Sequence, residues 1–169
     1  MDIVLETVSM YKKDTLFRLL QYSLFEESIS DGNDMNDEAL FEYPWFELYF
    51  TEEEREAYFI KEQGTGRLLG FVMINTHMEK RSPGHSIAEF MVLPKFRRNN
   101  IGKKAAVTCF DMHRGNWEVS PSCGSNQAYL FWKNVIGGYT ENNCQYEDGI
   151  FLFSNHRQGK DSPLLSEAL

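Results

Sequence analysis

The sequence predicts a mixed α/β domain whose central sheet is mostly antiparallel and is flanked by helices. Short runs of β-forming residues alternate with three segments in which apolar residues recur at helical spacing. Glycine-containing turns join some neighbouring runs closely enough for hairpins, which pair antiparallel strands. The chain of 169 residues is long enough for one domain with a substantial core. We expect that single domain to span residues 1–155, with a C-terminal tail at 156–169.

The first third of the chain predicts a strand, a helix and an aromatic segment. Residues 2–8 alternate apolar and polar side chains, as a half-buried strand does. Leucines recur at near-helical spacing in residues 11–28, which predicts an amphipathic helix. The segment 41–58 is dense in aromatic residues and interrupted by Pro44, so only its part near 45–56 is expected to be helical.

The middle of the chain predicts a hairpin followed by a further strand. Residues 56–75 contain two β-rich runs around a turn in which Gly64 and Gly66 supply the necessary backbone freedom. After a polar loop, the apolar run at 87–93 predicts the next strand.

The last third predicts two helices and two more strand regions. Residues 101–115 have an apolar side at helical spacing and end at a glycine, which is a common C-terminal signal. Residues 117–119 form a short strand candidate. A second amphipathic helix is expected at 126–138, ended by its two glycines, and a strand or hairpin at 145–155.

The charge of the chain excludes some classes of partner. The formal net charge is -8 and the pI is about 5.0, so nonspecific binding to nucleic acid or to an anionic membrane is not expected as the main function. The basic residues at 95–104 are a local exception to this acidic composition, and they suit a small anionic ligand.

The cysteines and the N-terminus indicate a cytoplasmic protein. Cys109, Cys123 and Cys144 have neither the spacing of metal ligands nor the even number of a disulfide framework, so no metal is expected. Such a scattered set is typical of a reducing compartment. The first residues lack the pattern of a signal peptide, and no apolar run approaches the roughly 18 residues that span a membrane.

The segment 95–104 joins the predicted strand to the predicted helix and has the features of an anion-binding turn. A helix N-terminus leaves backbone N–H groups without partners and adds partial positive charge. Asn99 and Asn100 tolerate unusual dihedral angles or cap the helix, and Gly102 lets a ligand approach the backbone. Four basic side chains surround the turn: Arg97, Arg98, Lys103 and Lys104. These residues alone are equally consistent with a solvated basic loop.

Pro94 indicates that regular pairing of the strand ends just before this turn. Proline lacks an N–H group, and it directly follows the apolar run of the strand. A strand whose pairing ends there leaves backbone groups free for an extended ligand that itself contains amides. A pyrophosphate joined to an amide-rich arm, as in coenzyme A, fits such a surface.

At these residues the sequence resembles the GNAT superfamily of acyl-CoA-dependent N-acyltransferases. The run RRNNIG is similar to the family signature R/Q-x-x-G-x-G/A, with Arg97 in the first place, Gly102 in the last, and Asn100 in place of the first glycine. Asparagine is the next most tolerant residue in a left-handed turn, so the turn is expected to keep its shape. The resemblance covers about 57–153 and implies a GNAT-like fold and an N-acetyltransferase that uses acetyl-CoA.

The resemblance also implies which residues bind the coenzyme. The backbone of Met91, Val92 and Leu93 would pair with the pantetheine arm. The pyrophosphate would lie on backbone amides of Arg98, Asn99, Asn100, Ile101, Gly102 and Lys103, with Arg97 beside them. The later helix would flank the coenzyme through Asn126, Ala128, Phe131 and Trp132. Trp132 stands where the family often has a tyrosine that acts as general acid, and an indole cannot take that role.

Acyl transfer from a thioester to an amine also requires groups that accept and donate protons. Glu89, early in the predicted strand, is the candidate base, and the alternative is a solvent-facing or ion-paired carboxylate. His85 in the preceding loop is a weaker candidate. Tyr129 is the candidate acid, one helical turn before Trp132, and the alternative is an aromatic that packs on the sheet. Cys123 has no sequence setting of a nucleophile.

The sequence leaves the acceptor amine unidentified, whether a small molecule or a peptide. The aromatic segment at 41–50 is a candidate for the acceptor groove, or simply part of the core, and the acidic run after it slightly favours a cationic amine. A noncatalytic acyl-CoA-binding or interaction module on the same fold is the alternative function, and a homodimer remains open.

Overall fold

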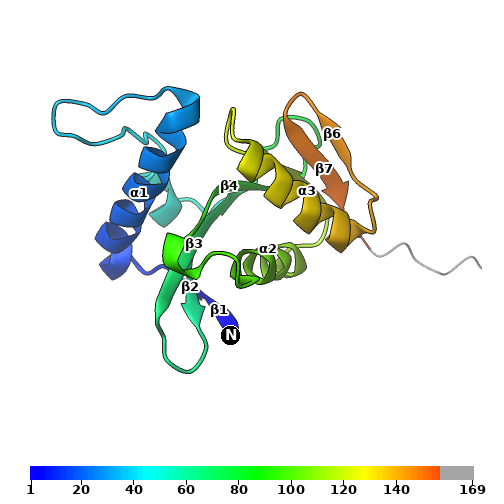
Figure 1. Ribbon diagram of the computed structural model, residues 1–169, viewed down its shortest axis with the longest axis horizontal. Helices are drawn as coiled ribbons and strands as arrows, with labels where there is room; N and C mark the ends of the chain where they lie inside the picture. The colour runs from blue at the N-terminus through cyan, green and yellow to red at the C-terminus, as the bar shows by residue number, and fades with distance from the viewer. Residues whose placement is uncertain (157–169) are drawn as a thin grey trace, which may run out of the picture.

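One seven-stranded sheet with helices on both faces forms the frame of the protein (Figure 1). The structure is a computed structural model and describes residues 1–156. The strands are β1 (Ile3–Thr7), β2 (Arg55–Glu62), β3 (Leu68–Asn75), β4 (Gly84–Val92), β5 (Asn116–Val119), β6 (Gln145–Glu147) and β7 (Ile150–Ser154). The helices are α1 (Lys13–Asp31), α2 (Ile101–Met112) and α3 (Asn126–Thr140), with single 3-10 turns at Met10–Lys12, Glu47–Phe50 and Pro94–Phe96.

The sheet is antiparallel except at one place near its middle. The strand order is β1-β2-β3-β4-β5-β7-β6, and only the β4–β5 pair is parallel. The prediction of a mixed fold with a mostly antiparallel sheet is confirmed, and so is the hairpin of β2 and β3. A parallel pair needs a crossover, and α2 with its flanking loops provides it.

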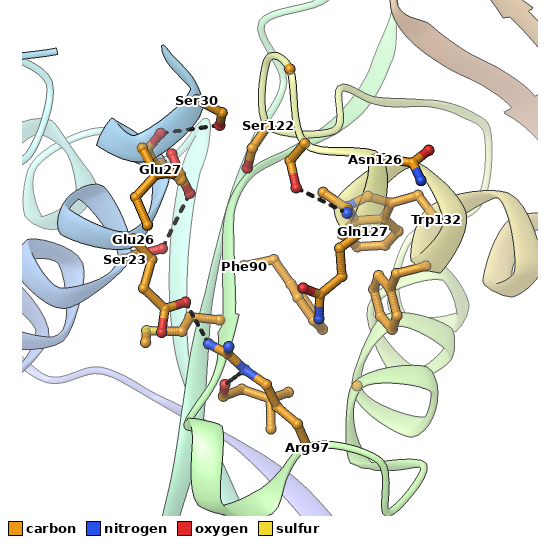
Figure 2. A pocket seen from close by; sticks show the side chains of 18 of the residues that line it. Ser23, Glu26, Glu27, Ser30, Phe90, Arg97, Ser122, Asn126, Gln127 and Trp132 are labelled. Carbon is orange, nitrogen blue, oxygen red and sulfur yellow. Dashed lines mark hydrogen bonds and ion pairs between the residues drawn. The ribbon is translucent and has the colours of Figure 1, made fainter. Parts of the chain in front are cut away.

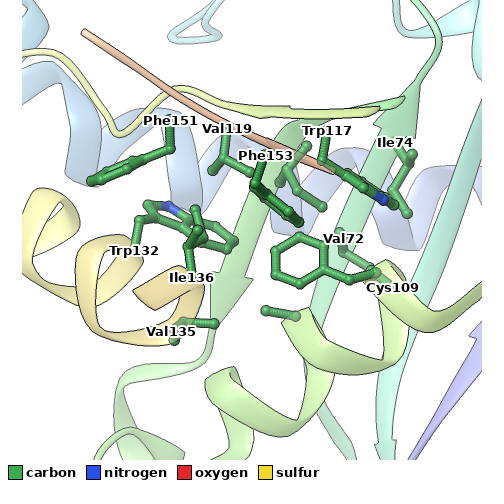
Figure 3. Packing of buried hydrophobic residues seen from close by; sticks show 13 residues of the cluster. Val72, Ile74, Cys109, Trp117, Val119, Trp132, Val135, Ile136, Phe151 and Phe153 are labelled. Carbon is green, nitrogen blue, oxygen red and sulfur yellow. The ribbon is translucent and has the colours of Figure 1, made fainter. Parts of the chain in front are cut away.

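The two faces of the sheet carry separate apolar clusters. One cluster packs α1 against β2 and β3 through residues such as Leu16, Leu20 and Phe71. The other packs α2 and α3 against β3, β5 and β7, and Figure 3 shows Trp117 and Trp132 within it. Because β3 is covered on both faces, its six residues 69–74 are all buried, which explains their continuous apolar sequence.

Two expectations about helices are wrong. The glycines at 137 and 138 do not end α3, which continues to Thr140 and ends at Glu141 in the left-handed conformation. Gly137 is instead buried, and a Cβ there would lie 3.0 Å from Asn142 Oδ1, so this close approach explains the glycine. The aromatic segment has only the short turn Glu47–Phe50. The predicted tail lies outside the described residues except for His156.

A buried glutamate fixes the loop that joins β3 to β4. Glu118 on β5 is 2% exposed, and its carboxylate accepts hydrogen bonds from the backbone N–H groups of Glu79 (2.8 Å), Lys80 (2.7 Å) and Arg81 (2.7 Å). A buried charge requires such partners, and three backbone donors satisfy it. The start of β4 is thereby held beside β5.

Candidate active site

The strands β4 and β5 separate after four residue pairs. Their parallel pairing runs only from Gly84–Asn116 to Ile87–Val119. Beyond this point β4 continues along β3, whereas the chain leaves β5 into the loop 120–125. An extra residue in β4, between Ile87 and Glu89, makes a bulge where the separation begins, and bulges bend the strand that contains them. The last five residues of β4 therefore have an edge without a strand partner among residues 1–156 (Figure 1).

The register of β4 decides which backbone groups face this open edge. The N–H of Leu93 donates to the carbonyl of Leu69 (2.8 Å), and Met91 lies opposite Phe71 on β3. Since backbone direction alternates along a strand, Met91 and Leu93 pair with β3 and only Phe90 and Val92 point to the open edge. The expectation that Met91 and Leu93 offer backbone groups to a ligand is therefore not met.

The turn before α2 presents a continuous row of backbone donors. The N–H groups of residues 98–103 have no hydrogen-bond acceptor within the described part of the chain, and Lys104 is the first to bond, to the Asn100 carbonyl (3.0 Å). Arg98 (φ 65°) and Asn100 (φ 58°) are both left-handed, which turns these amides around one point. The Asn100 side chain makes no capping hydrogen bond. The side-chain Nδ2 group of Asn99 donates to the carbonyls of Phe96 and Arg97. This geometry is that of an anion cradle at a helix N-terminus.

A groove of about 850 Å³ joins the cradle to the open edge of β4 (Figure 2). Its walls are the second half of α1, the end of β4, the start of α2, the loop 120–125 and the first turns of α3. The predicted cofactor-binding residues that line it are Met91, Val92, Arg97, Arg98, Gly102, Asn126 and Trp132. The side chains of Leu93, Asn99, Asn100, Ile101 and Lys103 are not among those found to line it. Ile101 is instead buried in the core.

Arg97 connects three walls of the groove. Its Nε donates to the Val92 carbonyl (2.8 Å), and its Nη2 forms an ion pair with Glu26 on α1 (2.6 Å). One of the open-edge groups of Val92 is therefore already occupied by a side chain. Arg97 fixes the end of β4 against α1, a structural role that its place in the sequence motif does not reveal.

Helix packing, as well as ligand binding, explains the glycine at position 102. A Cβ at this position would lie 3.0 Å from the ring of Phe131 on α3. The expected free approach of a ligand is therefore restricted on this side, because Phe131 occupies the space beside the glycine. The residue lets α2 and α3 approach closely at the mouth of the groove.

The two aromatic candidates on α3 line different pockets. Trp132 is 5% exposed and packs edge-to-face on Phe90, with ring centroids 5.0 Å apart, at the base of the groove. Tyr129 packs on Tyr146 and Phe151 and lines a separate pocket next to β6 and β7. The structure therefore does not bring Tyr129 to the groove, and its aromatic packing agrees with the alternative interpretation.

Glu89 lies just beyond the inner end of the groove, on the face of β4 that α1 covers. Its carboxyl is half-buried and is not among the groups found to line the groove. Burial raises the pKa of Glu89 to about 8, and the charge of Glu27 acts in the same direction. The Tyr43 hydroxyl, which can donate a hydrogen bond to the carboxylate, acts in the opposite direction.

The other sequence candidates lie away from the groove or lack partners. His85 stacks on His113 with ring centroids 4.0 Å apart, and His113 Nε2 lies 2.9 Å from a Glu56 oxygen, on the side of the sheet that α2 covers. Cys123 is exposed in the loop 120–125 and has no hydrogen-bond partner within residues 1–156. Neither residue contributes to the groove.

Two carboxylates of the groove were not found by sequence reasoning. Glu26 and Glu27 line the wall that α1 forms, together with Ser23, Ile29 and Ser30 (Figure 2). Ser23 Oγ donates to Glu27 Oε1 (3.3 Å), and burial raises the pKa of Glu27. The polar residues 23, 26, 27 and 30 recur at i, i+3, i+4 and i+7, so helical spacing is a signal that identifies this polar face.

Comparison with known proteins gives a family and a fold. Residues 20–120 match the model of the acetyltransferase (GNAT) family. No curated protein matches the chain. Within residues 1–156, the helices are too short or too polar to cross a membrane.

Solved structures of acetyltransferases share the fold. A putative acetyltransferase (YycN) from Bacillus subtilis is 13% identical, with a TM-score of 0.59 over 79% of this chain and 90% of that chain. The aminoglycoside 6'-N-acetyltransferase AAC(6')-Ih from Acinetobacter baumannii is 14% identical, with a TM-score of 0.55 over 80% and 90%. The aminoglycoside acetyltransferase AAC(6')-Ib, solved with coenzyme A, is 12% identical, with a TM-score of 0.58 over 91% and 95%.

Proposed function

Because the chain belongs to the GNAT acetyltransferase family, we propose that it transfers an acetyl group from acetyl-CoA to a primary amine. The main observation is the row of backbone amides at residues 98–103 that have no acceptor among residues 1–156 and that lie beside the open edge of β4 in one groove. A pyrophosphate binds well to such a row, and an amide-containing arm pairs with a bare strand edge. Coenzyme A contains both a pyrophosphate and an amide-containing arm. The groove places the anion cradle and the open strand edge one after the other along its length.

In this proposal the coenzyme extends along β4 from the cradle toward Glu89. The amides of residues 98–103 hold the pyrophosphate, with Arg98 and Lys103 at the rim. Phe90 and the N–H of Val92 pair with the pantetheine arm, while Asn126 and Trp132 flank it from α3. The thioester then lies past Phe90, where a backbone N–H on the open edge can polarise its oxygen.

The acceptor is proposed to be an amine on two grounds. The family model describes acetyltransferases, and similar structures include enzymes that are named as aminoglycoside N-acetyltransferases. The carboxyl of Glu27, which lines the inner part of the groove, suits an ammonium group. Three cysteines without disulfide bonds agree with the proposed cytoplasmic location.

Calorimetry and thiol release test this proposal. We expect acetyl-CoA to bind and a panel of primary amines (spermidine, kanamycin and lysine methyl ester) to release free coenzyme A thiol. Arg98→Glu places a negative charge in the cradle and should weaken acetyl-CoA binding by about tenfold or more. Arg114→Glu makes the same charge change just past the other end of α2 and should leave binding unchanged. Absence of acetyl-CoA binding to the wild-type protein would refute the assignment.

One observation favours the noncatalytic alternative. Trp132 stands where the family often has a proton-donating tyrosine, and Tyr129 lies outside the groove. A protein that only binds acyl-CoA needs no such donor. Tight acetyl-CoA binding without thiol release, with every amine of the panel and at every pH tested, is the result that this alternative predicts.

A further inference from the structure

Glu27 presents its carboxylate to the groove, whereas Glu89 lies behind the inner end of the same groove. We propose that Glu27 takes the proton from the attacking amine, and that Glu89 is a positioning residue that acts through it. This inference rests on the proposed acetyl transfer, because it assigns a catalytic residue to that reaction.

The position of Glu27 is fixed by hydroxyl groups on its own helix and opposite it. Ser23 Oγ donates to its carboxylate (3.3 Å), and Ser30 Oγ donates to its backbone carbonyl (3.1 Å). Ser122 also lowers the pKa of Glu27, and Figure 2 shows it on the opposite side of the groove from Glu27. The bond from Ser23 gives the carboxylate a preferred direction, as a base requires.

The end of the groove at which Glu27 lies is narrow. A Cβ on Gly124 of the loop 120–125 would lie 3.3 Å from Ser30, so this loop and the end of α1 nearly touch. Gly124 is left-handed (φ 72°), which lets the loop approach. At the opposite end lie the cradle and the Arg97–Glu26 ion pair. One end of the groove therefore suits an anion, and the end at which Glu27 lies suits the reacting amine.

The thioester of a coenzyme bound in the cradle reaches the level of Glu27. Pairing along Val92 and then Phe90 directs the arm toward Glu89, the next residue on β4. The charge of Glu27 on α1 raises the pKa of Glu89 on β4. An amine that attacks the thioester there meets Glu27 from the open groove, and Glu89 lies behind it.

The charged and polar groups around Glu27 shift its pKa in opposite directions. Glu26 and Asp31 act on it from α1, Glu89 lies on β4, and the hydroxyls of Ser23 and Ser122 stabilise its charged form. Burial and the charge of Glu27 both favour the protonated form of Glu89. Of the two carboxyls, Glu27 is the one that lines the groove and can meet the amine there.

The proposed step balances as follows. The amine nitrogen forms a bond to the carbonyl carbon of the thioester, and the bond from that carbon to sulfur breaks. Glu27 takes one proton from the nitrogen, and the thiolate takes one proton from solvent. Glu27 then returns its proton to solvent, so the products are the N-acetyl amine and free coenzyme A.

The experiment measures the pH dependence of kcat/KM for Glu27→Gln, Ser23→Ala and Glu26→Gln. Thiol release is followed with the best amine of the panel and, independently of any acceptor, as slow hydrolysis of acetyl-CoA, in which water replaces the amine. Glu27→Gln should lower kcat about a hundredfold or more and remove the acidic limb of the profile. Ser23→Ala removes a hydroxyl that lowers the pKa of Glu27, so the acidic limb should move to higher pH while the plateau is kept.

Glu26→Gln is the matched control, because it removes a neighbouring carboxylate from the same wall. It breaks the ion pair with Arg97, so it should change KM for acetyl-CoA, and because it removes a neighbouring negative charge it should move the acidic limb slightly to lower pH, opposite to the shift expected for Ser23→Ala. If Glu27→Gln keeps kcat within about twofold, or Ser23→Ala leaves the limb unmoved, the inference is wrong. The Ser23→Ala result decides the matter even if Glu27→Gln does not fold. Failure of the wild-type protein to bind acetyl-CoA is a separate result that refutes the proposed function instead.

Discussion

Asn100 occupies the position at which the family motif has its first glycine, and its backbone is left-handed (φ 58°). Asparagine adopts this conformation at lower cost than other residues with a Cβ, which explains how the turn forms without glycine. The preceding left-handed residue, Arg98, has no such advantage. The cradle therefore depends on two residues in an unfavourable conformation.

Asn100→Val should lower the free energy of unfolding by about 1–2 kcal/mol, because a branched Cβ is strained at positive φ. Asn100→Gly removes the Cβ and serves as the control, with little change expected. Urea denaturation of both variants measures the difference. Equal stability of the two would show that the turn is not left-handed in solution.

The raised pKa of Glu89 predicts how the stability of the folded protein depends on pH. Its pKa is about 8 in the folded protein, above the ordinary value of 4.5. Between these values the unfolded chain loses a proton that the folded protein keeps, so the stability of the folded state falls as pH rises from about 4.5 to about 8. Denaturation midpoints of the wild type should therefore fall more across this range than those of Glu89→Gln. Parallel pH dependence of both proteins would contradict the raised pKa.

At the residue scale, the sequence predicts what depends on near neighbours in the chain. The left-handed turn at Asn100 and the cradle follow from a short local motif. The role proposed for Glu27 depends on its neighbours on β4 and on Ser122, which lies nearly 100 residues later in the chain. No local sequence pattern indicates these neighbours. The backbone direction of Met91 depends on strand register, which residue types alone do not determine.

The hydrogen bonds of Glu118 predict what its substitution does to the loop between β3 and β4. Its two carboxylate oxygens accept three backbone N–H groups from residues 79–81. Glu118→Gln replaces one acceptor with an NH₂ group that faces a donor, so a loss of about 2 kcal/mol in unfolding free energy is expected. Amide hydrogen exchange should become faster at residues 79–81. Exchange that is faster elsewhere but unchanged at these three residues would refute this account of the loop.

At the element scale, helices and strands with strong periodicity are predicted well, and their ends are predicted poorly. α3 passes through two glycines because Gly137 is buried where a side chain does not fit, and tertiary packing overrides the local stop signal. The open edge of β4 was expected at residues 91–93, just before Pro94. It begins earlier, at the bulge after Ile87, because β5 ends at Val119, opposite Ile87.

The whole described chain shares one sheet, which predicts cooperative unfolding. Strands from both ends of the chain, β1 and β7, belong to it, in agreement with the proposed single domain at 1–155. Trp117 and Trp132 are buried in the cluster under α2 and α3, whereas far-UV circular dichroism also reports α1. Urea transitions followed by tryptophan fluorescence and by circular dichroism should coincide. Separate midpoints would show that the two faces of the sheet unfold independently.

The bare edge of β4 has one further consequence, which concerns solubility. An exposed strand edge of this kind normally invites the strands of other molecules and promotes aggregation. Here the edge lies between α1 and α3, and the loop 120–125 bounds the gap where β4 and β5 separate. These elements leave little room for a strand of a second folded protein. The separation of two neighbouring strands thus keeps hydrogen-bonding groups available to a slender ligand while it hides them from other protein chains.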